Sequence, residues 1–159
     1  MSPDETTSLY IAPEVRSLME ERGIAEDNLR TVLASAENGR QYHSQESSGH
    51  RLAHVTPAKV TYWVEYLPQD DGYRIFNAYS HRMKIIQGYN LPSKKEQVAT
   101  GWLCAACDLP LQIAVVKLTY LDETFAADLP SCPACQRVFI SEEQAVVKMA
   151  QAERMLEDK

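Results

Sequence analysis

Residues 104–135 read CAACDLPLQIAVVKLTYLDETFAADLPSCPAC and contain all four cysteines of the chain. The stretch begins with Cys104-Ala-Ala-Cys107 and ends with Cys132-Pro-Ala-Cys135, and 24 residues separate the two pairs. A C-x2-C pair holds two thiolates on one tight turn, and two such turns facing each other make a tetrahedral four-sulfur site. We therefore predict that Cys104, Cys107, Cys132 and Cys135 bind one metal ion.

The identity of the metal rests on weaker signals than the site itself. Four thiolates suit Zn²⁺ and also a single iron of the rubredoxin type. Rubredoxin-type turns usually carry glycine directly after the second cysteine, where a positive φ brings backbone N–H groups close to sulfur. This chain has Asp108 and Gln136 at those positions. We expect a structural zinc, with iron at the same four cysteines as the alternative.

A thiol–disulfide redox motif is the other reading of a C-x2-C pair. That chemistry needs the pair at the N-terminus of a helix, where the helix dipole lowers the pKa of one thiol. The residues after Cys135 read as a short strand at Val138–Ile140, and Pro110 follows Cys107 closely. Neither pair opens a helix, so the sequence favours the metal site.

The composition is that of a folded protein that stays out of the membrane. The chain has 159 residues, 45% of them hydrophobic, and no run approaches the roughly 18 apolar residues that span a bilayer. The acidic start Met1-Ser2-Pro3-Asp4-Glu5 does not resemble a secretory signal. We expect a cytoplasmic protein, and in a reducing cytosol paired C-x2-C motifs indicate metal ligands rather than disulfides.

The charge distribution argues against nucleic acid as a partner. The net charge is −6, and residues 101–159 contribute −4 of it, with 5 basic and 9 acidic side chains. Zinc ribbons that bind nucleic acid do so with a basic surface that neutralises phosphates. The acidic balance instead mildly favours a basic protein partner.

The first part of the chain predicts two helices on a small antiparallel sheet. Val60–Leu67 is the clearest strand, with Val60, Tyr62, Val64 and Tyr66 on one face. A return strand with a break or bulge should place Tyr73, Ile75, Tyr79 and Met83 on its inner face. The remaining expected elements are helices at 13–22 and 26–37, an exposed polar loop at 39–49, a strand at 51–56, a turn at 68–72 and the return strand at 73–86.

The predicted fold class is α+β, with a helix-plus-antiparallel-sheet domain followed by a zinc-ribbon or rubredoxin-like β module with a C-terminal helix. We place the α+β domain at 1–90, a linker at 91–100 and the four-cysteine ribbon at 101–159. Within the ribbon, 111–115, 116–121 and 138–140 are strand-like. Ser141 and Gln144 form an S-x-x-Q capping box, which predicts a helix from about Ser141 to Glu157.

The histidines suggest no second metal site. His43 and His50 fall in the polar loop, where we expect them to be solvated. His50 and His54 are four residues apart, which on a strand is roughly 13 Å and too far to chelate one ion. His81 belongs to a polar and aromatic cluster with Tyr79 and Arg82. That cluster is either a binding surface or, as we favour, a sheet edge whose polar groups are hydrogen-bonded.

No sequence motif supports an enzymatic activity. Neither a G-x-G-x-x-G loop nor a Walker loop is present, no nucleophile elbow occurs, and no carboxylate pair can be assigned. The acidic pair Glu142-Glu143 is explained by the start of the predicted helix, where the dipole favours acids. Trp63 and Tyr62 fit packing in a central strand better than a cofactor platform. We expect a non-enzymatic protein.

A longer pattern runs through residues 101–159. It consists of Cys104-x2-Cys107, Val116, Tyr120-Leu121, Pro130-x-Cys132-Pro133-x-Cys135, Val138, Glu143, Lys148-Met149, Glu153 and Leu156-Glu157-Asp158-Lys159. With this pattern the ribbon resembles a family of small four-cysteine redox proteins associated with molybdenum-containing aldehyde oxidoreductases of anaerobic bacteria. The run from Lys148-Met149 to the C-terminus is the more specific part of the resemblance, and the chain departs from the family pattern at Asp108 and Gln136.

The stretches Val60–Tyr66 and Asn77–Met83 are similar to an extension of flavin-dependent pyridine-nucleotide oxidoreductases from the same kind of gene neighbourhood. Together the two resemblances imply a chain that joins two small modules serving one enzyme system. They imply a protein partner, such as a redox enzyme, and either a scaffolding or an electron-shuttling role.

Overall fold

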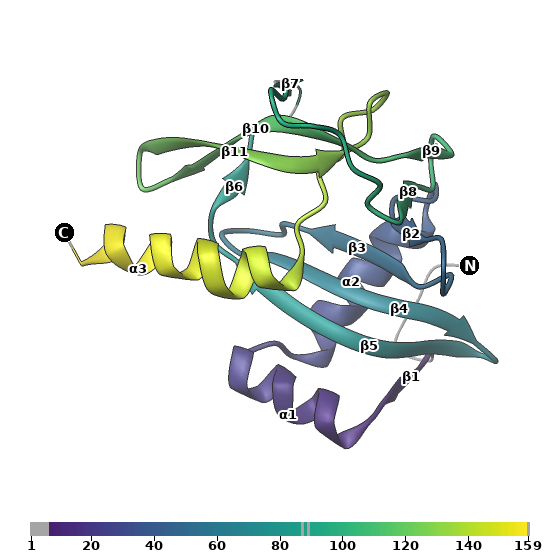
Figure 1. Ribbon diagram of the computed structural model, residues 1–159. Helices are drawn as coiled ribbons and strands as arrows, with labels where there is room; N and C mark the ends of the chain where they lie inside the picture. The colour runs from purple at the N-terminus through teal and green to yellow at the C-terminus, as the bar shows by residue number, and fades with distance from the viewer. Residues whose placement is uncertain (1–6, 87, 89, 159) are drawn as a thin grey trace.

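Two sheets form the centre of the molecule in the computed structural model, which describes residues 7–86, 88 and 90–158 (Figure 1). The acidic N-terminal residues Met1–Glu5 and the final Lys159, which entered the predictions above, lie outside the described residues. Helices α1 (Pro13–Arg22) and α2 (Glu26–Glu37) pack on one face of the larger sheet, and the smaller sheet and α3 (Ala150–Glu157) lie on its other side. The fold class is α+β, with a cysteine cluster and a C-terminal helix in the last third of the chain.

The larger sheet has seven strands in the order β1-β5-β4-β3-β2-β8-β9. All neighbours are antiparallel except β1 and β5, which are parallel. The sheet draws on both parts of the chain, because Cys104 ends its strand β8 and Cys107 lies in the turn between β8 and β9. Its strands are β1 (Ser8–Ile11), β2 (His43–Gln45), β3 (Arg51–Val55), β4 (Thr61–Gln69), β5 (Gly72–His81), β8 (Trp102–Cys104) and β9 (Leu109–Pro110).

The smaller sheet is built around one long hairpin. Strand β10 (Gln112–Tyr120) pairs with β11 (Glu123–Ser131) over its whole length. The other edge of β10 is shared by β6 (Lys84–Ile85) at one end and β7 (Leu91–Pro92) at the other. Between β7 and β8, the side-chain amide of Gln97 bonds both backbone groups of Ile113, at 2.7 and 2.8 Å. The predicted linker at 91–100 is thus tied to this sheet at two points, and its status as a domain boundary stays a prediction.

The two N-terminal helices form as the sequence predicts. Helix α1 runs from Pro13 to Arg22 and α2 from Glu26 to Glu37. Gly23 ends α1 with φ +68°, a left-handed conformation that glycine adopts without a steric cost. The buried residues of α2 repeat every three or four positions, so one stripe faces the sheet. That stripe consists of Leu29, Val32, Leu33 and Ala36.

The predicted inner face of the return strand is wrong, because a bulge exchanges the faces of β5. Glu65 pairs with Asn77 and Tyr66 with Ile75, which leaves Phe76 without an opposite residue. Before the bulge, Tyr73 and Ile75 pack on the side of α1 and α2; after it, Tyr79 and Met83 pack on the opposite side. One extra residue reverses the alternation of side chains along a strand, so the period-two pattern could not continue through the bulge.

The larger sheet therefore separates two hydrophobic cores. The core on the helix side contains the α2 stripe with Val64, Tyr66 and Ala78. The core on the other side joins Leu52, Trp63 and Tyr79 of the sheet to residues of the last third of the chain. Those partners include Val116, Leu118, Leu129, Ile140, Ala145 and Met149. The last third of the chain thus packs directly on one face of the larger sheet.

Three further expectations about strands and turns are wrong. Residues 39–49 are not one exposed loop, because His43–Gln45 forms β2 between β3 and β8. Val138–Ile140 is not a strand and makes only the isolated bridge between Ser131 and Val138; the partner of β10 is instead β11. The turn predicted at 68–72 is shorter, because β4 extends to Gln69 and β5 begins at Gly72.

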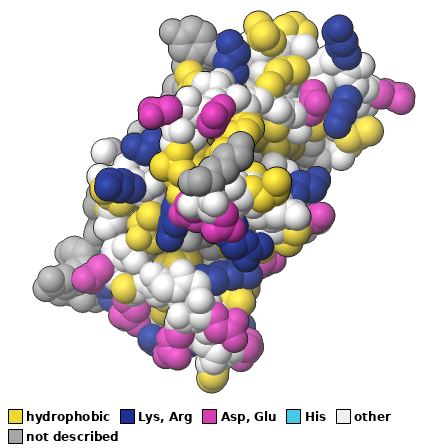
Figure 2. Space-filling model, turned by 90° about the vertical axis from the view of Figure 1, so that its left-hand side faces the viewer, with side chains coloured by type: hydrophobic (Ala, Val, Ile, Leu, Met, Phe, Trp, Pro, Cys, Tyr) yellow, Lys and Arg dark blue, Asp and Glu magenta, His cyan; other side chains and the backbone are white. Residues whose placement is uncertain are grey.

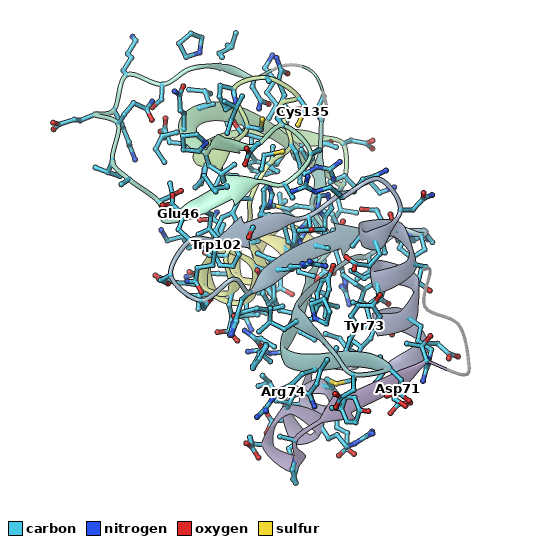
Figure 3. All side chains as sticks on the ribbon, turned by 90° about the vertical axis from the view of Figure 1, so that its right-hand side faces the viewer. Glu46, Asp71, Tyr73, Arg74, Trp102 and Cys135 are labelled. Atoms are coloured by element: carbon cyan, nitrogen blue, oxygen red, sulfur yellow. The ribbon has the colours of Figure 1, made fainter. Side chains whose placement is uncertain are left out.

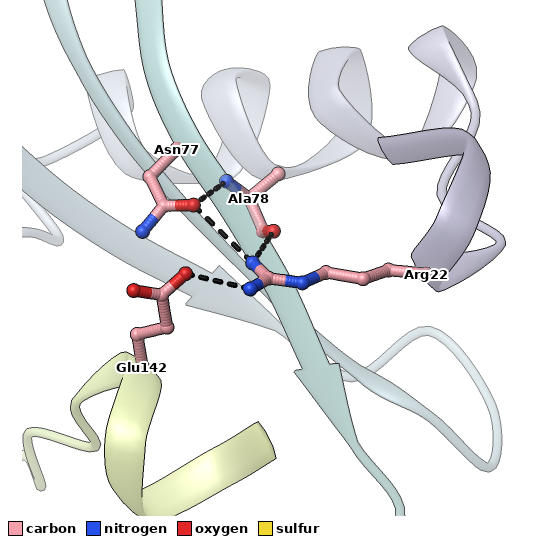
Figure 4. A network of polar contacts seen from close by, with 4 residues as sticks. All are labelled: Arg22, Asn77, Ala78 and Glu142. Carbon is pink, nitrogen blue, oxygen red and sulfur yellow. Dashed lines mark hydrogen bonds and ion pairs between the residues drawn. The ribbon is translucent and has the colours of Figure 1, made fainter. Parts of the chain in front are cut away.

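The C-terminal helix is present and contains a π-helical segment. Gln144–Met149 is π-helical and α3 follows from Ala150 to Glu157. The Gln144 backbone N–H donates to the Ser141 hydroxyl at 3.2 Å, which is the N-cap bond of the expected capping box. Arg22 at the end of α1 reaches across to the start of this helix and to β5, where it contacts Glu142 and the Ala78 carbonyl (Figure 4). In the described part of the chain, no helix has the length and apolar character needed to cross a membrane.

Candidate metal centre

The two cysteine pairs sit on turns of the same construction. In the first, the Asp108 N–H donates to the Cys104 carbonyl at 2.7 Å; in the second, the Gln136 N–H donates to the Cys132 carbonyl at 3.0 Å. The residue after the second cysteine has a positive φ in both turns, +56° at Asp108 and +65° at Gln136. The turns thus adopt the left-handed conformation that glycine usually provides, without glycine.

The four sulfur atoms form one compact group. The Sγ atoms of Cys104, Cys107, Cys132 and Cys135 all lie within 4.8 Å of one another. The Cys104 and Cys135 sulfurs are 3.7 Å apart. Sulfurs that lie about 2.3 Å from a tetrahedrally bound zinc would be separated by roughly 3.8 Å, so the group fits such an ion. The predicted ligand set is brought together as a possible metal site by segments from both sheets.

Each cysteine pair belongs to a different sheet. Cys104 is the last residue of β8 in the larger sheet, whereas Cys132 directly follows β11 in the smaller one. A metal bound to both would tie the two sheets together at this end of the molecule. In Figure 3, Cys135 lies at this end, far from Asp71 and Tyr73 at the other.

The electrostatics of the four thiols together favour the binding of a cation. Hydrogen bonding to Cys132 and then to Cys135 raises the pKa of Cys107 to about 12. Burial is the main cause that raises the pKa of Cys104. The pKa of Cys132 is lowered: burial acts against this, but the backbone N–H groups of Cys135 and Ala134 stabilise its thiolate. Four thiolates at these distances repel one another, and a bound divalent cation offsets that repulsion.

The metal centre lies at the surface of the protein, with two of its cysteines buried and two reaching solvent. Cys104 and Cys132 are buried with Leu111 in a small core of their own, which Trp102 and Phe139 border. Cys107 is partly exposed and Cys135 is exposed. Two ligands thus act as core residues, while the other two reach the surface.

A buried histidine behind the first cysteine pair escaped the sequence analysis. His43 is not solvated as expected but 1% exposed, and its strand β2 lies inside the sheet between β3 and β8. It lies opposite Cys104 in the strand pairing, and its ring meets Phe139 edge-on at 5.5 Å. Neither ring nitrogen has a hydrogen-bond partner among the described residues. Burial, and then His54 and Arg137, lower its pKa to about 3.

The other histidines are placed by packing rather than by a metal. His50 is partly buried rather than solvated: it stacks on Phe76 at 3.9 Å and contacts the Glu65 carboxylate at 2.7 Å. His54 stacks on Trp63 at 4.2 Å. His81 is buried at the end of β5, where both ring nitrogens are hydrogen-bonded. Within the described residues, the four cysteines form the one group of metal-ligating side chains.

A comparison with protein families matches only the last part of the chain. Residues 100–159 match a family model described as a domain of unknown function, DUF7479. The match covers both cysteine pairs, the hairpin of β10 and β11, and the C-terminal helix. No curated protein and no solved structure matches the chain.

Proposed function

We propose that this protein is a non-enzymatic, metal-binding accessory protein of a redox enzyme system, with one structural zinc at Cys104, Cys107, Cys132 and Cys135. The proposal of a bound metal rests on the grouping of four sulfur atoms within 4.8 Å of one another. When bound, zinc supplies folding free energy and no redox chemistry. The accessory role rests on the two resemblances found in the sequence.

The structural role of the metal follows from where its ligands lie. Cys104 and Cys132 are core residues of a region whose own hydrophobic cluster is small. Strand β8 has only three residues and β9 only two. Such short strands are marginal by themselves, so a metal that joins them to the end of β11 stabilises this end of the molecule. We place the surface that docks a partner on the α+β part of the chain.

An iron-based one-electron carrier is the alternative, and two observations favour it. Asp108 and Gln136 adopt the positive φ that the iron-binding turns require, so their side chains do not prevent that geometry. The Ala134 N–H also lies 3.4 Å from the Cys132 sulfur. N–H groups directed at thiolates help to set the potential of a bound iron.

The deciding experiment is metal analysis together with a visible spectrum, on protein purified without oxygen and without added metal. One zinc per chain and a colourless solution support the structural role. One iron per chain with thiolate charge-transfer bands that bleach reversibly on reduction supports the electron carrier. Protein without stoichiometric metal, whose Cys132→Ser variant melts like the wild type, contradicts both.

The partner is tested separately from the metal. The purified protein is used as bait against extract of the source cells, and captured proteins are scored for bound flavin, molybdenum or iron–sulfur groups. Enrichment of a redox enzyme that survives a salt wash supports the accessory role. Capture that is the same for wild type and for protein heated until it unfolds counts against it.

A further inference from the structure

A cavity of about 440 Å³ lies where the end of α1, the end of β5 and helix α3 meet. No cysteine is among its lining residues, so it is separate from the metal centre. Three arginines from distant parts of the sequence line it: Arg22, Arg82 and Arg154. Figure 2 faces this side of the molecule and shows dark blue basic and magenta acidic side chains side by side just below the middle of the view.

Two of the three arginines already have partners. Arg22 donates to Glu142 at 2.7 Å and to the Ala78 carbonyl at 2.8 Å, and only 20% of its side chain is exposed (Figure 4). Arg82 forms an ion pair with Glu157. The guanidinium of Arg154 has no hydrogen bond or ion pair with any described residue. Its five N–H donors are therefore available to a ligand.

The acidic groups of the cavity are held by other groups of the protein. Glu153 is buried, and one carboxylate oxygen accepts the backbone N–H groups of Arg82 and Met83, each at 2.8 Å. One oxygen of Glu157 accepts from Arg82 and from the Tyr120 hydroxyl. Neither carboxylate forms an ion pair with Arg154, and the lining has three arginines against these two carboxylates.

Two hydroxyl groups complete a set of free donors. Tyr62 and Ser80 lie directly opposite each other on β4 and β5, and both line the cavity. Cross-strand neighbours have their Cβ atoms about 5 Å apart on the same face of the sheet. Neither hydroxyl is hydrogen-bonded to a described residue. One guanidinium and two hydroxyls therefore offer donors at this cavity.

We propose that this cavity binds a small organic anion through a phosphate or carboxylate group held by Arg154, Tyr62 and Ser80. Arginine matches both groups with two parallel N–H bonds, and hydroxyls donate readily to the remaining oxygens. The volume exceeds that of the anionic group alone, so the cavity also accommodates the organic part of the molecule. This site goes beyond the proposed function and does not depend on it.

The test is a titration of ¹⁵N-labelled full-length protein, followed by amide chemical shifts. The probes are glycerol 3-phosphate and succinate, at constant ionic strength so that general screening is the same throughout. We expect saturable shifts at Tyr62, Ser80 and Arg154. The probe that binds more tightly identifies phosphate or carboxylate as the group recognised.

Substitutions make the assignment specific. Arg154→Gln should weaken binding about tenfold or more, since it removes a charge-assisted, bidentate contact. Lys148→Gln is the matched control, because it removes one exposed positive charge from the same helix without touching the cavity. Tyr62→Phe and Ser80→Ala should each weaken binding by a smaller factor. Both helix variants should keep the metal content of the wild type.

Two results would overturn the proposal. One is the absence of saturable shifts with either probe at millimolar concentration. The other is equal weakening by Arg154→Gln and Lys148→Gln, which would reveal attraction by overall charge alone. Neither result bears on the metal centre, whose test uses metal content and colour.

Discussion

The indole Nε1 of Trp63 donates a hydrogen bond to Nε2 of His81, at 2.9 Å, in the core between the two sheets. This Nε2 must therefore be unprotonated, and the proton of the neutral ring lies on Nδ1, which donates to the Met83 carbonyl at 2.7 Å. Protonation of Nε2 would oppose two N–H groups. The contact thus requires a neutral histidine in the packing between the two halves of the chain.

Acid should destabilise this protein through three histidines that the fold keeps uncharged, the buried His43 and His81 and the partly buried His54. Burial is the largest cause that lowers the pKa of His43 and His54 to about 3 and that of His81 to about 4. The unfolded chain binds a proton on each near its ordinary pKa of 6.5, while the folded chain does not, so stability falls as the pH drops below 6.5. At pH 5 the expected loss is about 2 kcal/mol for each histidine.

Urea unfolding at pH 7.5, 6 and 5 measures this loss. His54→Phe keeps the stacking on Trp63 and removes one titrating group, so this variant should lose about 2 kcal/mol less than the wild type between pH 7.5 and 5. The comparison also separates histidine protonation from acid release of a metal, which is common to both proteins. Parallel pH profiles for the two proteins would show that His54 is charged in the folded state.

Substitution of Arg22 should destabilise the protein more than substitution of its ion-pair partner Glu142. Arg22→Ala removes the donor to the Ala78 carbonyl at a partly buried site, which costs about 1–3 kcal/mol of unfolding free energy, while Asn77 keeps its bond from the Ala78 N–H. Glu142→Gln removes only a charge that is 42% exposed and should cost about 1 kcal/mol or less.

The matched control is Arg16→Ala. Its ion pair with Glu26 has the same length, 2.7 Å, but both side chains are at least 40% exposed. That substitution should change stability by about 0.5 kcal/mol or less. Chemical denaturation of the three variants ranks them, and a loss for Arg22→Ala no greater than that for Arg16→Ala would show that the Ala78 contact contributes nothing.

What the sequence could and could not predict follows from the range of the interactions involved. Helices α1 and α2 and the ligand group depend on local signals: apolar spacing, a glycine stop and two short cysteine motifs. Which side chains of β5 share a face depends on the bulge at Phe76, and no residue type near Phe76 indicates a bulge. The burial of His43 depends on β8, a strand about 60 residues later in the chain, so its polar surroundings in sequence pointed to solvent.

The turns of the metal centre show a different limit. Because Asp108 and Gln136 stand where such turns usually have glycine, the sequence argued against a positive φ there, yet both residues adopt one. Aspartate visits this region at modest cost, but glutamine does so rarely. The geometry is imposed by the cysteines on either side of the turn and by the hydrogen bond back to the first of them. Tertiary constraint here outweighs the preference of the single residue.

Gln136→Gly should therefore stabilise the protein. It removes the strain of a left-handed glutamine, about 1 kcal/mol, and also a side-chain oxygen that is buried without a partner. The greater freedom of glycine in the unfolded chain offsets part of this gain. Thermal melts should show a higher Tm at unchanged metal content.

The control for this change is Gln151→Gly on the exposed surface of α3. Glycine inside a helix costs about 1 kcal/mol relative to a good helix former, so this variant should melt at a lower temperature. Opposite signs at the two glutamines would establish that backbone conformation decides the effect. A lower Tm for Gln136→Gly would mean that its side chain makes a favourable contribution that exceeds the strain.

Removal of the metal should loosen one end of the molecule before the rest. Cys104 ends β8 and Cys132 follows β11, so chelation releases the link between the two sheets while both hydrophobic cores remain. Metal binding supplies roughly 10 kcal/mol in small zinc domains, and a large drop in Tm is expected here. Hydrogen exchange should rise first at 102–111 and 131–138, while α2 and β4 stay protected. Cys107→Ser should reproduce the pattern without chelator, and exchange that rises equally in α2 would show that the metal supports the whole fold rather than this end.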